Sequence, residues 1–545
     1  KKKLHFKKFT LSNAFHSQYI PYSQTGKFSK IILDYIDNPQ KLEDYFEHPV
    51  NIEGIKASLI KRKKFNTNRA LLTEQLQIQY KDIEEGEQVK ANIQMLCLEN
   101  TFTVCTAHQP NIFTGHLYFI YKILHAIKLT DELKKQLPGY NFVPVFFMGS
   151  EDADLEELNF VIVDGKKYEW QPNQTGAVGR MKVDDGLLKL INEIEGRLSV
   201  ERYGNDVIAL LKKCFQKNTT IEQATFLLVH HLFKDFGLVV FLPDNATLKK
   251  VMLPVFEEDI FKNIPSTIVG RSSEKLAKNY KIQAHPREIN LFYLKEGLRN
   301  RIVPFKDQFI VADTDIVFSK DELKKELKNH PGHFSPNVIL RGLYQEMILP
   351  NIAFIGGGGE IAYWLELKDL FLNYQVPFPL LLVRNSFVLV AKRYHKLLEK
   401  TNLNIPDLFR GSQVLLNEIV TTQTSHRLSL DDEKLQVQQA YGSIKKAVSD
   451  IDTTLEQHVE SLQTKILKKL VALEKKMLRA EKRNFEDQKN QLAKLFAALF
   501  PGGNLQERTE NFMLHYAKES SSFFDILYEN SMTLEQKFCI LDGFQ

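Results

Sequence analysis

The sequence has few cysteines, no long apolar run and almost no net charge. Its 545 residues include four cysteines, Cys97, Cys105, Cys214 and Cys539, and no two of them form a Cys-x-x-Cys motif. This spacing excludes the common paired-cysteine metal and redox motifs. Few, scattered cysteines are typical of a reducing cytoplasm and argue against a disulfide framework.

Membrane and nucleic-acid binding are disfavoured by what is missing. No segment reaches the roughly 18 unbroken apolar residues that cross a bilayer, and the run "PFPLLLV" stops at Arg384. The basic start "KKKLHFKKF" lacks the apolar stretch of a secretory signal. The 72 basic and 67 acidic residues give a net charge of +5, which leaves no electrostatic footprint for nucleic acid. We therefore expect a cytoplasmic protein.

What the chain does contain is an alternation of strands and helices. "TFTVCTA" (Thr101–Ala107) and "FVPVFFMG" (Phe142–Gly149) have the pattern of buried strands, and apolar residues recur at helical spacing in His116–Leu137 between them. "FGLVVFLPD" (Phe236–Asp244) predicts a further core strand. This order predicts an α/β fold with a doubly wound parallel sheet. An Asp164-Gly165 turn predicts a hairpin within an insertion at about 155–235.

The last quarter of the chain changes character. From Leu455 to Ala480, apolar residues recur at spacings of three and four among Lys, Glu, Gln and Arg, which predicts a long coiled-coil helix. "FPGGNLQER" (500–508) is expected to end it, and its partner is either the segment from about 416 to 449, folded back, or a second chain. We expect a core over 1–410, a helical coiled-coil domain over 411–515, and a return to the core over 516–545.

Polar residues gather at the predicted ends of the core strands. In open α/β sheets, ligands bind beyond the carboxyl ends of the strands, so residues that follow several strands are expected to share one pocket. The alternative for each single residue is a helix cap. The residues concerned are His108, Gln109, Asn111, Thr114, Gly115 and His116 after the first strand, then Ser150, Glu151, Asp152, Asp154, Asp244 and Glu360.

Four consecutive glycines stand in "NIAFIGGGGEIAYWLELK" (351–368). They indicate left-handed dihedrals or a close approach of the backbone to a ligand, and the alternative is a flexible turn. The loop fits neither common phosphate motif, because Ile361 stands where a third glycine is needed. Glu360 at the helix start would repel phosphate, so we expect the loop to admit an amine or sugar hydroxyls. A first-turn acid that complements the helix dipole is the alternative for Glu360.

Three shorter stretches have open alternatives. "FTGH" (113–116) matches only the Gly-His half of the H-x-G-H signature of adenylating enzymes. "SEDAD" (150–154) fits a divalent-metal site, recognition of a substrate amine or hydroxyls, or a solvated helix start. Arg341 is placed to bind a carboxylate, or to form a helix-surface ion pair with Glu346.

Seven ordered blocks together resemble one family, the cysteine-adding enzymes of bacillithiol biosynthesis, the BshC family of cysteine ligases. The blocks are "FTGHLYFIYKI", "PVFFMGSEDADLEELN", "QTGAVGRM", "INLFYLKEGLRNRI", "FSPNVILRGLYQE", "LPNIAFIGGGGEIAYW" and "PFPLLLVRNS". The resemblance implies a Rossmann-like core with connecting-peptide insertions, similar to class I aminoacyl-tRNA synthetases, and a coiled-coil domain that supports homodimers. It implies ligation of L-cysteine to the amine of glucosaminyl malate, the last step in making bacillithiol.

Under this resemblance we expect ATP to activate a carboxylate, although no K-M-S-K-S segment is present, and we leave the metal unassigned. Ala153 stands where many members have His, so either the catalytic base lies elsewhere or this subgroup works differently. The other functional classes are an inactive coiled-coil scaffold and a nucleotidylyltransferase for a sugar phosphate. The expected catalytic residues are Glu151, Asp152, Asp154 and Glu360. The expected substrate-binding residues are His108, Gln109, Thr114, Gly115, His116, Asn337, Arg341, Gly357, Gly358, Tyr363 and Arg384.

Overall fold

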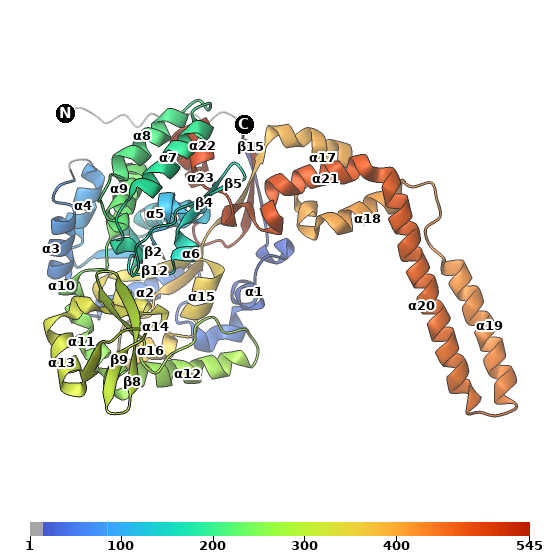
Figure 1. Cartoon of the computed structure of the whole chain (residues 1–545), viewed down its shortest axis with the longest axis horizontal. Coiled ribbons are helices and arrows are strands. Elements are labelled where there is room, and N and C mark those ends of the chain that lie inside the picture. Colours follow the sequence, from blue (N-terminus) through green and yellow to red (C-terminus); the bar gives the residue numbers. More distant parts are fainter. Residues whose placement is uncertain (1–14, 84–85, 545) are drawn as a thin grey trace. The chain divides into compact units, whose positions relative to one another are not determined.

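The computed structural model describes residues 15–83 and 86–544 (Figure 1). It divides into two compact units, one built mainly from 27–389 with 504–541 and the other from 390–503. The helical unit therefore begins and ends earlier than the expected 411 and 515, and the chain returns to the first unit at Asn504. The unit begins earlier because α17 (His395–Thr401) packs against α21 (Glu486–Leu499). The sequence does not indicate this, because the heptad-like pattern begins only at Leu455.

The core of the first unit is a five-stranded parallel sheet, as the sequence predicts. Its strand order is β13-β12-β2-β3-β6, and every neighbouring pair runs parallel. The strand order reverses at β2, which lies between β12 and β3. Such a reversal is where open α/β sheets bind ligands. The strands are β2 (Thr101–His108), β3 (Asn141–Met148), β6 (Val239–Phe241), β12 (Asn351–Gly356) and β13 (Leu380–Val383).

Burial explains why these segments form the centre. The side chains of β2 are buried up to its last residue, His108, as a strand covered on both faces requires. Helix α5 (Tyr118–Gln136) crosses from β2 to β3. Its Ala126, Leu129 and Leu133 pack into one apolar cluster with Phe102 of β2 and Leu380 of β13. The buried face of α5 thereby fixes the position of its N-terminal turn beside the end of β2.

Two insertions interrupt the core. The first lies between β3 and β6 and contains the predicted hairpin, with Asp164 and Gly165 both at positive φ (50° and 76°) as a two-residue turn of this kind requires. The second lies between β6 and β12 and holds an antiparallel sheet of order β10-β9-β8-β7-β11. The elements of the first are α6 (Leu155–Leu158), β4 (Phe160–Val163), β5 (Lys166–Glu169), α7 (Asp185–Leu198), α8 (Gly204–Cys214) and α9 (Ile221–Phe233). Those of the second are α10 (Ala246–Lys249), α11 (Leu253–Lys262), α12 (Ile264–Ala277), β7 (Leu291–Lys295), β8 (Leu298–Phe305), β9 (Gln308–Val311), β10 (Val317–Ser319), α13 (Lys320–Asn329), β11 (Phe334–Pro336) and α14 (Val338–Ile348).

The helical unit contains an antiparallel hairpin of α19 (Asp431–Ser449) and α20 (Leu455–Glu481), which lie side by side in Figure 1. At one end the Leu430 N–H donates to Glu474 at 2.7 Å, and at the other Ser449 donates to Glu456 at 2.6 Å. The folded-back partner is therefore within the same chain. The long helix breaks at 482–485 and continues as α21, so "FPGGNLQER" follows α21 and does not end α20.

This hairpin leaves most of its apolar side chains exposed. No side chain of α19, all of which the structure describes, is buried, and Val459 is the one buried side chain of α20. Leu435 is 53% exposed, Ile444 46% and Leu473 46%. Over 15–83 and 86–544, no helix combines the length and apolar character that crossing a bilayer requires.

Candidate functional site

A cavity of about 360 Å³ opens at the carboxyl ends of the core strands, where the strand order reverses. Eleven of the expected site residues line it: His108, Gln109, Glu151, Asp152, Asn337, Arg341, Gly357, Gly358, Glu360, Tyr363 and Arg384. Four expected residues do not: Thr114, Gly115, His116 and Asp154. Six polar or charged residues that the sequence analysis did not single out also line it: Tyr118, Lys122, Glu157, Arg299, Tyr344 and Arg508.

The "FTGH" loop is held away from the cavity by its own backbone. Phe113, Thr114 and Gly115 all have positive φ (50°, 69° and 64°). A Cβ at Gly115 would lie 2.9 Å from the Asn111 side chain, so only glycine fits there without a shift. The Asn511 amide donates to the carbonyls of Phe113, at 2.9 Å, and Gly115. The conformation of this loop is thus fixed by contacts within the protein.

Of the two histidines predicted at the cavity, His108 lines it and His116 does not. The His116 imidazole lies 3.2 Å from the Thr509 carbonyl and packs against Phe160. His108, the last residue of β2, lines the cavity instead, and its buried Nε2 has no hydrogen-bond partner among the described residues. Burial, together with the nearby charge of Lys122, holds the pKa of His108 well below 6.5. His108 is therefore a neutral imidazole at physiological pH.

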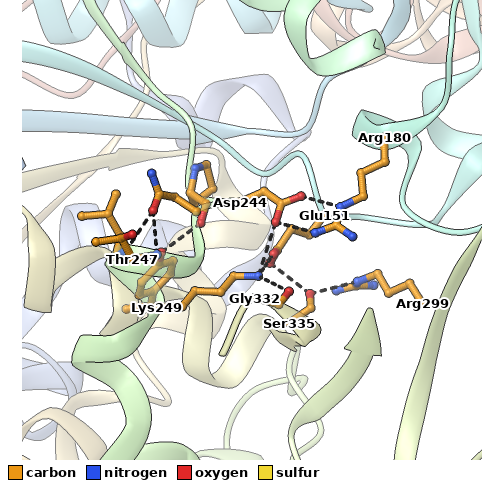
Figure 2. Close-up of polar contacts among 12 residues, drawn as sticks. Glu151, Arg180, Asp244, Thr247, Lys249, Arg299, Gly332 and Ser335 are labelled. Carbon is orange, nitrogen blue, oxygen red and sulfur yellow. Dashed lines mark hydrogen bonds and ion pairs between the residues drawn. The ribbon is translucent and has the colours of Figure 1, made fainter. Parts of the chain in front are cut away.

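Glu151 is built into the wall of the cavity (Figure 2). One carboxylate oxygen pairs with the fully buried Lys249, and the other accepts a hydrogen bond from Ser335 at 3.0 Å. Lys249 also lies 3.5 Å from Asp244, which pairs with Arg180 through two contacts of 2.7 and 2.8 Å. Burial raises the pKa of Glu151, and Lys249 opposes that rise. Because both oxygens are occupied, Glu151 shapes the wall and connects the segment after β3 with the second insertion.

Asp152 and Glu157 are the acids whose carboxylates face the cavity with more freedom. Asp152 accepts hydrogen bonds from Gln109 at 3.1 Å and from the Asp154 N–H at 3.2 Å. The Glu157 carboxylate has no hydrogen-bond or ion-pair partner in the part of the chain that the structure describes, while the Glu157 backbone carbonyl accepts from Asn111 at 3.1 Å. Burial, with the charges of Asp154 and Asp152, raises the pKa of Glu157. Among the described residues no group of three His, Cys, Asp or Glu side chains has the arrangement of a metal site.

The glycine loop approaches the cavity without left-handed dihedrals. Gly357, Gly358 and Gly359 line the cavity, and none of the four glycines has positive φ, so the expectation of left-handed backbone is wrong. A Cβ at Gly356 would lie 2.9 Å from the Phe354 ring, and one at Gly358 would meet Ile32 at 3.3 Å. Close packing therefore explains Gly356 and Gly358, and the open side of the loop is at Gly359.

Glu360 is bound by the protein itself. Its carboxylate accepts the Gly357 N–H at 2.8 Å, at the start of α15 (Gly358–Trp364), and it pairs with Lys122. Lys122 is buried and also donates to the Ala107 carbonyl at 3.0 Å. Burial lowers the pKa of Lys122, and Glu360 opposes that shift. In this structure the ammonium group at Glu360 therefore belongs to Lys122.

Gly359 offers a clean test of whether a ligand approaches the loop. A Cβ there meets no protein atom within 4 Å, and alanine is favoured over glycine inside a helix by roughly 0.5–1 kcal/mol. Gly359→Ala is therefore expected to keep or raise the melting temperature while weakening substrate binding. Thermal unfolding and calorimetric titration check the two effects separately. Unchanged affinity in a stable variant would show that no ligand contacts this part of the loop.

The cations of the cavity divide into paired and unpaired groups. Arg384 is buried and paired with Glu507 at 2.7 Å, and Lys122 is paired with Glu360. Arg341 donates to the neutral Tyr363 hydroxyl at 2.5 Å, while its other buried terminal nitrogen has no partner within the described chain. The Arg508 guanidinium has no hydrogen-bond or ion-pair partner over the same residues. Two guanidinium groups thus remain without a counter-charge.

The surface pair between Arg341 and Glu346 is not formed. Glu346 points from α14 into the core, where Arg62 of α2 (Ile52–Lys63) pairs with it at 2.5 Å, with side chains 1% and 0% exposed. This leaves Arg341, on the same helix, directed to the cavity. Arg341 and Glu346 are five residues apart and so are not neighbours on the helix surface, whereas the partner of Glu346, Arg62, lies far away in sequence.

Two family models match the chain over nearly its whole length. "Bacillithiol biosynthesis BshC, N-terminal Rossmann-like domain" matches residues 15–385, and "Bacillithiol biosynthesis BshC, C-terminal coiled-coil domain" matches 387–542. The chain belongs to the BshC family of bacillithiol biosynthesis. The resemblance and the fold class inferred from the sequence, a Rossmann-like core with a helical coiled-coil domain, are confirmed.

Curated relatives agree with this assignment. A protein of Flavobacterium johnsoniae, named "Putative cysteine ligase BshC", is 39% identical over 96% of this chain and 99% of its own length. Proteins of the same name from Cytophaga hutchinsonii and Christiangramia forsetii are 35% and 36% identical, over 97% and 96% of this chain and 98% of their own lengths. The family boundary near residue 386 also agrees with the division of the structure near residue 390.

Proposed function

We propose that the protein ligates L-cysteine to the amine of glucosaminyl malate. The observation that carries this proposal is the charge left over in the cavity once internal pairs are removed. Within the described residues, the side chains of Arg341, Arg508 and Glu157 form no ion pair. The malyl group of the acceptor has two carboxylates and the glucosamine has one amine, so its charges complement those of the cavity. The ligase names of the relatives support the same reaction.

The acceptor amine must lose a proton to attack the cysteine carboxyl carbon. We assign this step to Glu157, whose carboxylate is unpaired, faces the cavity, and has a raised pKa. A base with a pKa closer to the operating pH accepts a proton more effectively. Ala153 leaves no imidazole in the same loop, and Glu151 and Glu360 are occupied by Lys249 and Lys122. The amide nitrogen–carbon bond forms as the activated carboxyl oxygen leaves.

ATP is our proposed co-substrate. Arg341 and His108 line the cavity, and each has a buried nitrogen without a partner among the described residues, so these residues fit a phosphate group. When bound, ATP supplies the phosphate chemistry that turns a carboxylate oxygen of cysteine into a leaving group. A neutral His108 donates one hydrogen bond without adding charge, and Arg341 contributes the positive charge. The protein thereby orients the two reacting groups and reduces the entropy cost of bringing them together.

A ligation assay tests the proposed function. Purified protein is incubated with L-cysteine and glucosaminyl malate, with and without ATP, and products are identified by mass spectrometry. We expect bacillithiol to form only in the complete mixture, together with a nucleotide product. No bacillithiol in the complete mixture would contradict the ligase assignment and favour the scaffold alternative. Bacillithiol formed without ATP would retain the ligase and reject ATP.

We also propose that the hairpin of α19 and α20 binds a second copy of the chain, because its apolar side chains are exposed. Residues 430 and 474 are in contact, so 431–473 can be replaced by a short glycine-serine linker without removing 504–544. We expect the parent protein to be a dimer and the shortened protein a monomer by light scattering. An unshifted melting temperature for the core serves as the control, and a persistent dimer would contradict this assignment.

A further inference from the structure

Residues 504–511 return from the helical unit and are fastened to the walls of the cavity. Gln506 bonds both backbone groups of Leu389, accepting from its N–H at 2.8 Å and donating to its carbonyl at 3.3 Å. Asn511 donates to the strained loop at 113–115, and the Glu510 carbonyl accepts the Leu117 N–H at 2.8 Å. The segment therefore joins β14 (Ser386–Ala391) to the loop that leads into α5.

Glu507 makes the most buried of these contacts. Its side chain is 0% exposed, pairs with Arg384 at 2.7 Å, and accepts hydrogen bonds from Ser386 and the Phe387 N–H, each at 3.2 Å. A buried carboxylate with three donors has little freedom to move. The backbone at the next residue, Arg508, is consequently fixed at the edge of the cavity.

Arg508 differs from the neighbouring cations of this wall. Its side chain lines the cavity and is exposed, and the described residues provide no hydrogen-bond or ion-pair partner for it. Arg384 is neutralised by Glu507 and Lys122 by Glu360. A guanidinium on a rigid backbone, open to the cavity and without a counter-charge, is suited to bind an oxyanion through two parallel hydrogen bonds.

We propose that Arg508 is a substrate-binding residue that holds an oxyanion of a reactant in this cavity. The inference deepens the proposed function and relies on it for the choice of ligands. The oxyanion is either a carboxylate of the malyl group or a phosphate of the nucleotide. In both cases Arg508, which follows the helical unit in the sequence, contributes to the binding site of the Rossmann-like unit.

Calorimetric titration of the full-length protein tests this proposal with three ligands. Glucosaminyl malate supplies carboxylates, ATP supplies phosphates, and methyl glucosaminide has the sugar and amine without an anion. Arg508→Gln is expected to weaken binding of one of the two anionic ligands about tenfold to a hundredfold, the usual effect of losing a charged hydrogen bond. Binding of methyl glucosaminide is expected to stay within twofold. Arg508→Lys should restore part of the affinity by restoring the charge.

The control is Arg202→Gln, an exposed arginine in the first insertion that does not line the cavity. A loss confined to glucosaminyl malate assigns the carboxylate, and a loss confined to ATP assigns the phosphate. Equal affinity of parent and Arg508→Gln for both anions, or an equal loss in Arg202→Gln, would overturn the proposal, as would a parent protein that binds neither anion. The binding measurements do not require turnover. If Arg508→Gln weakens binding but the parent protein forms no bacillithiol, the ligase assignment is rejected and the role of Arg508 in binding is retained.

Discussion

Arg62→Leu is expected to lower the free energy of unfolding of the Rossmann-like unit by about 3–5 kcal/mol, the cost of leaving a buried charge without its partner. Arg62 donates to the Glu346 carboxylate at 2.5 Å, to the Glu346 carbonyl at 2.8 Å and to the Pro377 carbonyl at 2.9 Å. Glu346 also accepts from Gln345 and Asn351. Leucine fills part of the volume but leaves these acceptors without their donor.

The loss in Arg62→Leu is expected to depend on pH. Burial raises the pKa of Glu346 to about 7 even beside Arg62, and removal of Arg62 raises it further. A carboxyl whose pKa is higher in the folded than in the unfolded protein stabilises the fold when protonated, and this stability is lost as pH rises through the folded pKa. The difference between parent and variant should therefore be smaller at pH 6 than at pH 9.

Urea denaturation followed by tryptophan fluorescence measures this effect, because both tryptophans, Trp170 and Trp364, are buried in the same unit as Arg62. Arg202→Leu, at an exposed position, is the control and should change stability by no more than about 0.5 kcal/mol. Adding Glu346→Gln to Arg62→Leu should recover part of the stability, since the buried charge is gone. If Arg62→Leu alone is as stable as the parent at pH 8, the pair of Arg62 and Glu346 is not desolvated to the extent that its burial implies.

Glu157→Gln is expected to lower kcat of cysteine ligation by about 10²–10⁴-fold, the range typical of general acid–base catalysis. Glutamine keeps the size of the side chain and cannot accept the proton of the attacking amine. Because the Glu157 carboxylate has no partner within the described residues, no internal ion pair is lost, and the melting temperature should be unchanged. Steady-state kinetics with varied glucosaminyl malate separate the loss in kcat from any change in KM.

The neighbouring Glu156 provides the matched control, since it is exposed and does not line the cavity. Glu156→Gln should retain the parent kcat. The pH profile gives a second measurement: Glu157 acts as a base only when ionised, so the rate of the parent should fall as pH drops through its raised pKa. If Glu157→Gln retains the parent rate and the same acid limb, the base is another group.

The sequence alone determines the elements that depend on local pattern. The strands at 101–108 and 141–148 follow from buried apolar runs, and the helix between them follows from its spacing. The hairpin at Asp164 and Gly165 follows from the left-handed backbone that these residue types tolerate. The heptad-like spacing predicts α20. The rule that ligands bind where strands end predicts the rim of the cavity, because that rule needs only the order of strands and helices.

Tertiary structure decides which charges are available at that rim. Lys122 lies near the start of the amphipathic helix α5, and packing buries it against Glu360. Glu346 lies on the same helix as Arg341, yet it pairs with Arg62 of a distant helix. Arg508 follows a predicted coiled coil, so nothing local connects it with a site whose other residues lie before 390. Which distant charges pair depends on how the folded chain buries them, and sequence spacing does not encode this burial. Among the described residues, the side chains of Arg341, Arg508 and Glu157 remain at the cavity without an ion-pair partner.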